Sequence, residues 1–310
     1  MKIKKNFFYI LYALIFYFFV ILFIDIVVGN KLNKIYQGWN FQGFRGEIKL
    51  LKKKDYKRIA FFGGSGVMGY GLNYKDAFPY IIEKKFKSLN VDVVNLGLQG
   101  NGIAGINYDI KKYEYLDYDF AVIYNGYIDC TVKGFNSSST RLKSFFFRYF
   151  NYLPMLPLYL EEKIQLVIGN DLNEYYAKKA KKNRNQPIIC YQEKTDIKMT
   201  TPQKKKFINH MNKFYVIKLN KIMSYLEKKN KKIIIVTQPK YFDEKQEIHH
   251  SMILQNVMKY KNVYVLNLDN IDILDKKIAY DPLHLTKHGS NLVANKIIEF
   301  IKQKELLKIN

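Results

Sequence analysis

Cysteine is scarce in this chain of 310 residues, which has only Cys130 and Cys190. No Cys-x-x-Cys pair and no cluster of cysteine with histidine occurs. The sequence therefore gives no sign of a structural zinc site, and we expect neither a metal nor a cofactor. Whether the two cysteines form a disulfide with each other stays open at this stage.

Acidic residues are also in short supply, because basic residues outnumber them and give a formal net charge of +24. The basic residues are nearly all lysines spread along the chain, with no compact arginine-rich arm and no nucleic-acid-binding motif. This pattern indicates a solvated basic surface that favours anionic lipid or polysaccharide, and it argues against specific nucleic-acid binding. A hydrophobic content of 48% excludes general disorder and allows one or two domains with a sizeable core.

Charge is absent from Phe7 to Ile24, an apolar run that follows three lysines. As a helix this run is about 27 Å long, close to the thickness of the hydrocarbon core of a bilayer. A cleaved signal peptide has a shorter apolar core and a small-residue cleavage site, which this segment lacks. We therefore predict an uncleaved membrane anchor over residues 1–29, with membrane contact through 7–29. A buried core helix is the alternative.

The orientation of this anchor follows only in part from charge, because basic residues flank the apolar run on both sides. A short basic N-terminus usually stays in the cytoplasm, and long domains translocate largely regardless of charge. We therefore expect a single-pass protein whose remaining chain lies on the extracytoplasmic side. Residues 30–57 are polar and basic and form a predicted stem, in which we expect the aromatic side chains of 38–46 to pack on the following domain.

From residue 58 onward, short apolar runs alternate with helical patterns. The expected strands are 58–62, 91–96, 120–125, 232–237 and 262–266, and the expected helices are 76–88, 104–116, 204–229, 245–260 and 289–306. Such alternation predicts a three-layer α/β domain over 58–305, with about five parallel strands and helices on both faces of the sheet. Residues 131–200 break the alternation. We interpret them as an insertion that forms a cap over the site, a helix on the membrane interface or an ordinary helical insertion.

The first predicted strand enters a glycine-rich turn that contains Ser65. A serine in such a turn exposes its hydroxyl at the carboxyl end of a sheet, beside free backbone N–H groups. Gly64, Gly66 and Gly69 also fit the dinucleotide-binding pattern, but the next strand closes on Asn95, where that motif has an acidic residue. Nucleophilic catalysis by Ser65 is the favoured interpretation, and dinucleotide binding or a purely structural turn are the alternatives.

The partners that a nucleophilic serine needs occur near the C-terminus. Asp281 and His284 are three residues apart in the loop before the last expected helix. This spacing allows the carboxylate to bind one imidazole nitrogen while the other nitrogen points into a cleft. A serine hydroxyl is a weak nucleophile at neutral pH and needs such a base, and the carboxylate fixes the tautomer of the imidazole.

Together these motifs resemble the SGNH/GDSL hydrolase family. The motifs are Ser65 after two glycines, Gly97, the block 126–129, and Asp281 with His284. Residues 43–46 and 236–239 also resemble a membrane-anchored subgroup of that family. The resemblance implies a flavodoxin-like fold and an esterase or acyl-transfer reaction. It makes Ser65 the nucleophile, His284 the general base and then acid, and Asp281 the orienting carboxylate.

The resemblance also implies an oxyanion hole formed by the N–H groups of Ser65 and Gly97 and by an asparagine side chain. At the position of that asparagine this chain has Ile128, which has no donor, and Asn125 or Asn101 would have to substitute. Losing one such donor typically costs about 2.7–4 kcal/mol of transition-state stabilisation.

Two hypotheses about function follow. The first is a membrane-anchored serine esterase or acyltransferase that acts on acyl esters, such as acetyl esters of cell-envelope glycans. The second is a weakened or inactive SGNH-like domain that binds an acylated glycan or a partner protein. Neither the acyl group, the acceptor nor the oligomeric state follows from the sequence.

Other polar residues receive structural interpretations. We expect Asp129 to cap a loop, His288 to belong to the start of a helix, and His249 and His250 to lie on an exposed helix surface.

Overall fold

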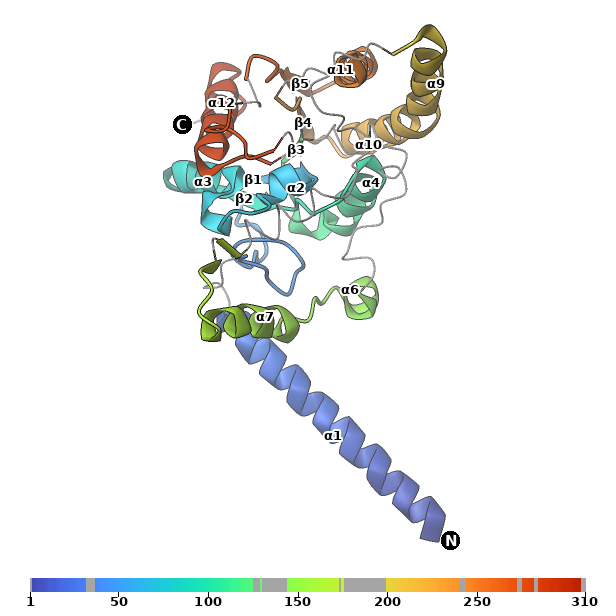
Figure 1. Cartoon of the computed structure of the whole chain (residues 1–310), viewed down its shortest axis with the longest axis vertical. Helices are drawn as coiled ribbons and strands as arrows, with labels where there is room; N and C mark the ends of the chain where they lie inside the picture. The colour runs from blue at the N-terminus through green and yellow to red at the C-terminus, as the bar shows by residue number, and fades with distance from the viewer. Residues whose placement is uncertain are drawn as a thin grey trace.

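Five short strands form one parallel sheet in the computed structural model of the chain (Figure 1). They are β1 (Lys57–Gly63), β2 (Val91–Asn95), β3 (Phe120–Tyr124), β4 (Lys232–Val236) and β5 (Val263–Leu266), in the spatial order β2-β1-β3-β4-β5. Each strand end lies within one residue of its expected position, so the predicted α/β fold is confirmed. The structure describes residues 2–31, 37–124, 129, 144–172, 174–175, 199–239, 244–271, 275–281 and 284–307.

The sheet is buried on both faces. Along β4, Ile233 and Ile235 belong to one hydrophobic cluster, and Ile234 and Val236 belong to another on the opposite face. Successive residues of a strand point to opposite faces, so a strand that is covered on both sides needs a continuous apolar sequence. This explains why the strands appear in the sequence as short unbroken apolar runs.

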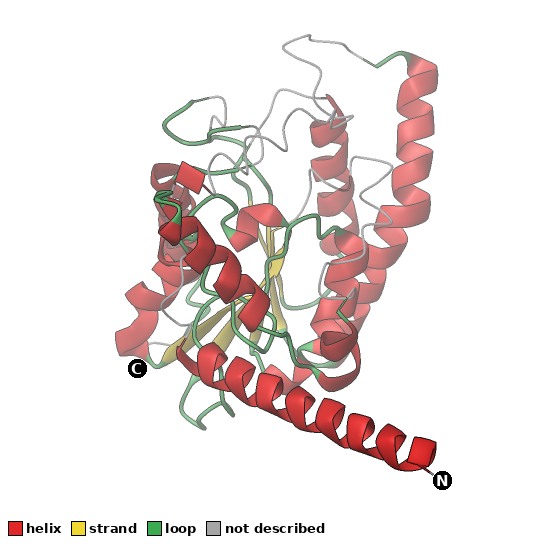
Figure 2. Cartoon of the chain, turned by 60° about the horizontal axis from the view of Figure 1, so that its bottom comes forward, coloured by secondary structure: helices red, strands yellow, loops and turns green. Residues whose placement is uncertain are grey.

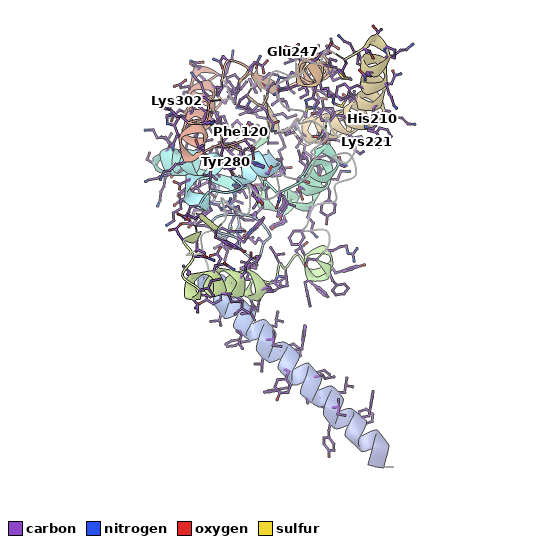
Figure 3. The ribbon with its side chains drawn as sticks, viewed as in Figure 1. Phe120, His210, Lys221, Glu247, Tyr280 and Lys302 are labelled. Carbon is purple, nitrogen blue, oxygen red and sulfur yellow. The ribbon has the colours of Figure 1, made fainter. Side chains whose placement is uncertain are left out.

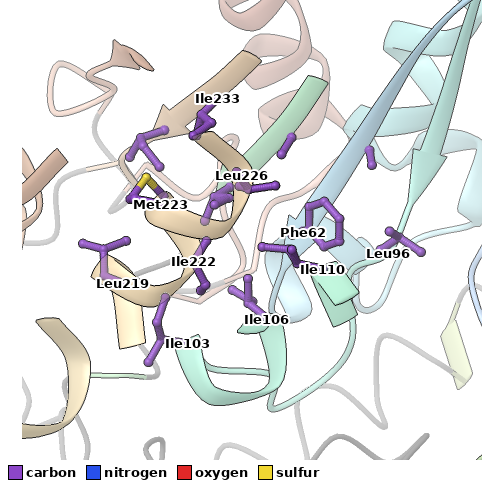
Figure 4. Packing of buried hydrophobic residues seen from close by; sticks show 14 of the residues in the cluster. Phe62, Leu96, Ile103, Ile106, Ile110, Leu219, Ile222, Met223, Leu226 and Ile233 are labelled. Atoms are coloured by element: carbon purple, nitrogen blue, oxygen red, sulfur yellow. The ribbon is translucent and has the colours of Figure 1, made fainter. Parts of the chain in front are cut away.

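Helices cover the two faces unequally. The first cluster contains residues of α4 (Ile103–Lys112), α10 (Ile217–Lys228) and α11 (Glu244–Val257), and the second contains residues of α3 (Phe78–Phe86) and α12 (Lys287–Gln303). Figure 4 shows the first cluster, in which Ile106 and Ile110 of α4 lie close to Ile222 and Leu226 of α10. These helices confirm the layers on both sides of the sheet.

The long helix expected over 204–229 is present but is not uniform. Helix α9 (Thr201–Met211) passes through a π-helical turn, Asn212–Val216, into α10. Short 3₁₀ turns at Tyr74–Asp76, Lys87–Leu89 and Glu114–Leu116 account for the remaining expected helical residues around α3 and α4.

Helix α1 (Lys2–Lys31) extends away from the rest of the chain (Figures 1 and 2). Its segment Phe7–Val27 has a mean hydropathy of 2.7 and is almost entirely unburied, so it is not a core helix. By length and composition this segment is able to cross a membrane, and an N-terminal signal sequence has the same properties.

The stem packs on the domain as predicted. Trp39 and Phe44 are buried, and the loop between them closes through hydrogen bonds from Asn40 N–H to Phe44 O and from Gly46 N–H to Gly38 O. Two helices of the 131–200 region lie beside this loop, namely α6 (Phe145–Phe150) and α7 (Leu156–Val167). The N–H of Leu153, between the two helices, donates to Phe41 O of the stem at 2.8 Å. Cys130 and Cys190 lie outside the described residues.

Candidate active site

Strand order places a topological switch point at the carboxyl ends of β1 and β3. Strand β1 pairs with β2 on one side and with β3 on the other. From β1 the chain passes to β2 on one side, and from β2 it crosses back past β1 to β3 on the other side. In open parallel sheets such a switch point is the usual place for a binding site. Ser65 stands there, because it follows the end of β1 after one residue and begins the short helix α2 (Ser65–Met68).

Glycines hold the neighbouring backbones against this turn. A Cβ atom at Gly97 would lie 2.2 Å from Met68 N, and one at Gly63 would lie 2.3 Å from Tyr124 O. Gly69 ends α2 in the left-handed conformation, with φ of 74°. A dinucleotide-binding turn opens a longer helix, so a helix of one turn argues against that alternative.

The structure brings Ser65, His284 and Asp281 together. Ser65 Oγ lies 2.9 Å from His284 Nε2, and His284 Nδ1 lies 2.7 Å from Asp281 Oδ2. The second carboxylate oxygen accepts the backbone N–H of His284 at 2.8 Å. The side chains of the histidine and the aspartate are 12% and 11% exposed, so the pair is largely shielded from water while the histidine reaches the serine.

Aromatic rings hold the imidazole of His284 from two directions. The ring of Tyr280, labelled in Figure 3, stacks on it at a centroid distance of 5.9 Å, and the ring of Tyr70 lies 5.1 Å away. The Tyr280 hydroxyl donates to Tyr70 O, and Tyr280 N–H donates to His284 O at 3.1 Å. These contacts link the histidine loop to the residues that follow the serine turn.

The histidine loop ends where α12 begins. Thr286 Oγ1 accepts the N–H of Gly289 at 3.1 Å and so caps the helix. A Cβ atom at Gly289 would lie 1.9 Å from Ile278 O, so only glycine fits where the start of α12 packs on the backbone of Ile278. His288 is exposed in the first turn of α12, as expected for a residue of the helix start.

Sequence reasoning assigned no role to Arg45, although the structure ties it to the serine turn. Its buried guanidinium donates from Nη1 to Met68 O and Gly69 O and from Nη2 to Leu72 O. These carbonyls belong to and follow the C-terminal end of α2, where the last carbonyls of a helix lack partners. A signal was available, because Arg45 is one of few arginines in a chain whose basic residues are nearly all lysine.

The predicted oxyanion-hole donors differ in their present partners. Within the part of the chain that the structure describes, the N–H of Ser65 donates to no acceptor, whereas Gly97 N–H donates to Asn95 Oδ1 at 3.0 Å. Asn101 Nδ2 donates to Asp109 Oδ2 at 2.8 Å, and this asparagine is fully buried. Asn125 and Ile128 lie outside the described residues.

Two further interpretations have opposite outcomes. Asp129 Oδ1 accepts the N–H of Ile103, the first residue of α4, at 2.8 Å, which confirms its capping role. The prediction that His249 and His250 are exposed is wrong, since both are buried. His249 precedes the buried Met252 and Ile253 by three and four residues, so it lies on the inner face of α11.

Among the described residues, no group of three or more histidine, cysteine, aspartate or glutamate side chains is placed to hold a metal ion. The described site contains a serine, an imidazole and a carboxylate joined by hydrogen bonds.

No family model matches the chain, and no curated protein matches it. Solved structures that resemble it include the psychrotrophic esterase EstA from Pseudoalteromonas sp., at 12% identity and a TM-score of 0.45, covering 81% of this chain and 100% of that one. The acetylxylan esterase Axe2 from Geobacillus stearothermophilus has 14% identity and a TM-score of 0.43, covering 82% and 96%. AlinE4, an SGNH-hydrolase family esterase, has 14% identity and a TM-score of 0.41, covering 81% and 98%. Likeness at these identities and TM-scores supports no statement about chemistry.

Proposed function

We propose that this chain is a serine hydrolase that cleaves acyl esters, with Ser65 as the nucleophile. The observation that supports the proposal is the hydrogen-bonded series from Ser65 Oγ through His284 to Asp281, with distances of 2.9 and 2.7 Å, at the switch point of the sheet. A serine, a base and an orienting group in this geometry are the arrangement that activates a hydroxyl at neutral pH.

The carboxylate determines which imidazole nitrogen bears the proton. An ionised carboxylate only accepts hydrogen bonds, so Asp281 Oδ2 favours a proton on His284 Nδ1 and leaves Nε2 free to accept one from Ser65. The other oxygen of Asp281 accepts the His284 N–H, which fixes the carboxylate in the same loop as the ring. The pair is therefore set for proton transfer before a substrate arrives.

The reaction then follows in two halves. Ser65 Oγ bonds to the acyl carbon while its proton moves to His284 Nε2, and the imidazolium returns that proton to the leaving alcohol. In the second half, water attacks the acyl-serine and gives its proton to the same nitrogen. The bond between the acyl carbon and Ser65 Oγ then breaks, the imidazolium returns the proton to Oγ, and the acid is released. The negative oxygen that forms in each half is placed near the N–H of Ser65, a donor without another acceptor in the described structure.

A finer proposal concerns location and substrate. We assign the chain to the extracytoplasmic face of a membrane, anchored through α1, with acetyl esters of cell-envelope glycans as its substrate class. Transfer of the acyl group to an alcohol instead of water remains part of this proposal. The apolar segment Phe7–Val27 supports membrane anchoring because it favours the hydrocarbon core of a bilayer. The excess of basic residues supports it because positive charge favours an anionic membrane surface.

The alternative is a domain that binds an acylated ligand without turning it over. Two features favour it: Gly97 N–H is already engaged by Asn95 Oδ1, and Ile128 has no side-chain donor. Each donor missing from an oxyanion hole typically lowers kcat by roughly 10²–10³ relative to a complete hole. If only Ser65 N–H remained as a donor, hydrolysis would therefore be slow. A complete set of Ser65, His284 and Asp281 favours the hydrolase.

Hydrolysis of p-nitrophenyl acetate by the full chain in detergent micelles tests the proposal. We expect Ser65→Ala to abolish turnover and His284→Ala to lower kcat by roughly 10²–10⁴. His288→Ala is the matched control, because this exposed histidine lies in the first turn of α12, outside the hydrogen-bonded series of Ser65, His284 and Asp281. Turnover that survives in Ser65→Ala, or that is absent from a cooperatively folded parent, would overturn the hydrolase assignment.

A further inference from the structure

Helix α7 presents an apolar stripe to the outside. Leu160, Ile164, Val167 and Ile168 are between 48% and 85% exposed, and their spacing places them along one side of the helix. A soluble surface rarely exposes a continuous row of large apolar side chains.

The opposite side of α7 is held by the body of the protein. Met155 and Leu158 belong to a hydrophobic cluster with Trp39 of the stem and Met68 of the serine turn. Glu162 is buried on the same side and accepts the N–H of Gln37 at 3.1 Å. The exposed stripe is therefore not a misplaced core face, since the helix already has one packed side.

Helix α6 also exposes large aromatic side chains. Phe145, Tyr149 and Phe150 are between 56% and 67% exposed, and the Arg148 guanidinium lies 5.0 Å from the centre of the Tyr149 ring. Aromatic rings with a polar end and neighbouring cations are typical of the boundary between lipid tails and headgroups. The seven exposed side chains named for α6 and α7, without Arg148, are called the α6–α7 surface below.

Asp25 fixes where α7 begins relative to the apolar segment of α1. Its buried carboxylate accepts the N–H groups of Met155 and Leu156 at 2.8 and 2.5 Å, as well as the hydroxyl of Tyr152. A carboxylate at a helix N-terminus is favourable, and an ionisable group in a span is tolerated when it is paired. Asp25 is two residues from Val27, about 3 Å along the helix, so α7 starts at the end of the apolar segment.

A second contact places α6 beside the same segment. The ring of Phe146 stacks on that of Phe18, with centroids 6.4 Å apart and an angle of 21° between the planes. Figure 1 shows α6 and α7 on the side of the body from which α1 emerges. The α6–α7 surface therefore continues the exposed apolar surface of α1.

We infer that the α6–α7 surface rests on the lipid bilayer that α1 crosses, with its apolar side chains among the lipid headgroups and upper tails. The bilayer is favoured over another protein because the surface is continuous with α1 and because the chain carries a net charge of +24, which suits anionic headgroups. The inference rests on the membrane location in the proposed function, but not on the chemistry of Ser65.

This arrangement has a consequence for the site. Helix α7 shares its inner cluster with Met68 and Tyr70, and the ring of Tyr70 contacts His284. A helix fixed on the bilayer by one side and to these residues by the other holds Ser65 at a constant height above the lipid. Such a geometry suits an ester whose carrier is close to the membrane surface.

Depth-dependent fluorescence quenching in the full chain tests the inference. In a Cys130→Ser, Cys190→Ser background, a bimane is attached to Ile164→Cys or Val167→Cys, and the protein is reconstituted in 3:1 phosphatidylcholine–phosphatidylglycerol vesicles. Lipids with a nitroxide at carbon 5 or carbon 12 are the quenchers. Ile15→Cys in α1 serves as the deep reference, and Lys205→Cys, an exposed site on α9, serves as the aqueous control.

We expect positions 164 and 167 to be quenched more strongly by the carbon-5 nitroxide than by the carbon-12 nitroxide. Position 15 should be quenched by the carbon-12 nitroxide, which lies deeper in the bilayer. Position 205 should be quenched by neither. Equal behaviour of 164, 167 and 205 would overturn the inference, and so would a position 15 without lipid quenching. Protection of 164 and 167 from aqueous iodide without lipid quenching would also overturn it, because a protein would then cover the surface.

Ester hydrolysis in the same vesicles separates the two proposals. Hydrolysis without quenching at 164 and 167 refutes only the membrane contact, and quenching without hydrolysis refutes only the proposed chemistry.

Discussion

Gly97 has no room for a side chain, because the backbone of the serine turn fills the space beside it. A Cβ atom there would lie 2.2 Å from Met68 N and 2.6 Å from Val67 C. We predict that Gly97→Ala lowers the free energy of unfolding by about 1–3 kcal/mol, since backbone must move to relieve the contact. It should also slow ester hydrolysis, because the shift displaces Ser65.

Gly64→Ala is the matched control for this substitution. Gly64 has φ of −84°, and a Cβ atom there meets only Asn101 O, at 3.2 Å. Urea denaturation should show a clearly smaller loss of stability than for Gly97→Ala. Equal losses would contradict the steric account of Gly97.

His249 makes the stability of the fold sensitive to acid. Burial, aided by the charge of His250, lowers the pKa of His249 from 6.5 to about 3, and its ring packs on Tyr215 at a centroid distance of 4.5 Å. Between these two pH values only the unfolded chain binds the proton. The free energy of unfolding therefore falls as the pH falls from 6.5 towards 3, by up to about 1.4 kcal/mol per pH unit.

The substitution His249→Leu should remove this part of the pH dependence. We expect urea denaturation of the variant at pH 7, 5.5 and 4.5 to give a flatter profile than the parent, whereas His288→Ala, at an exposed position, should keep the profile of the parent. Parallel profiles for His249→Leu and the parent would show that His249 does not titrate as its burial implies.

At the scale of secondary-structure elements, Arg45 joins the stem to helix α2. Its guanidinium donates to three carbonyls at the end of the serine turn, and lysine lacks the planar fork needed to replace these bonds. Arg45 is thus a positioning residue, which acts on the reaction through Ser65. We predict that Arg45→Lys lowers kcat for p-nitrophenyl acetate by roughly 10- to 100-fold with little change in KM, because small displacements of a reacting group are costly.

Arg58 offers the control for this prediction. It is the other buried arginine in the described part of the chain and bonds to Asp92 and Leu116, away from the serine turn. Arg58→Lys should lower the melting temperature without changing kcat of the folded enzyme. The same loss of kcat in both variants would mean that stability alone explains the effect.

Asp25 holds the first turn of α7, and its removal should loosen that helix. Without the carboxylate, the N–H groups of Met155 and Leu156 lose their acceptor. We predict faster amide hydrogen exchange over 155–159 in Asp25→Ala than in the parent, measured by mass spectrometry on the full chain. Exchange over α9, at 201–211, should stay the same. Unchanged exchange over 155–159 would refute the capping role of Asp25.

The sequence was sufficient to predict the strands of the sheet and the juxtaposition of Ser65, His284 and Asp281. Buried parallel strands are short apolar runs, which the sequence shows directly. The three-residue spacing of Asp281 and His284 holds their side chains together in one loop. The strand order then brings Ser65 to this loop. The buried histidines were missed, although the positions of Met252 and Ile253 three and four residues further along contain the signal.

At the scale of the whole molecule, a series of contacts joins the N-terminal helix to the candidate active site. Asp25 binds the start of α7, α7 packs on the stem, and Arg45 of the stem holds the turn of Ser65. Each of these contacts joins residues far apart in the chain. No local pattern in the sequence specifies such pairings, which explains why they appear only in the structure.

The proposed hydrolysis requires Ser65 to be an activated nucleophile, and formation of a covalent adduct measures this directly. The full chain is treated with a fluorophosphonate, digested and analysed by mass spectrometry. We predict one phosphonyl group on Ser65 in the parent and in His288→Ala, and almost none in His284→Ala. A folded parent without an adduct on Ser65, or an adduct that forms equally well in His284→Ala, would contradict it.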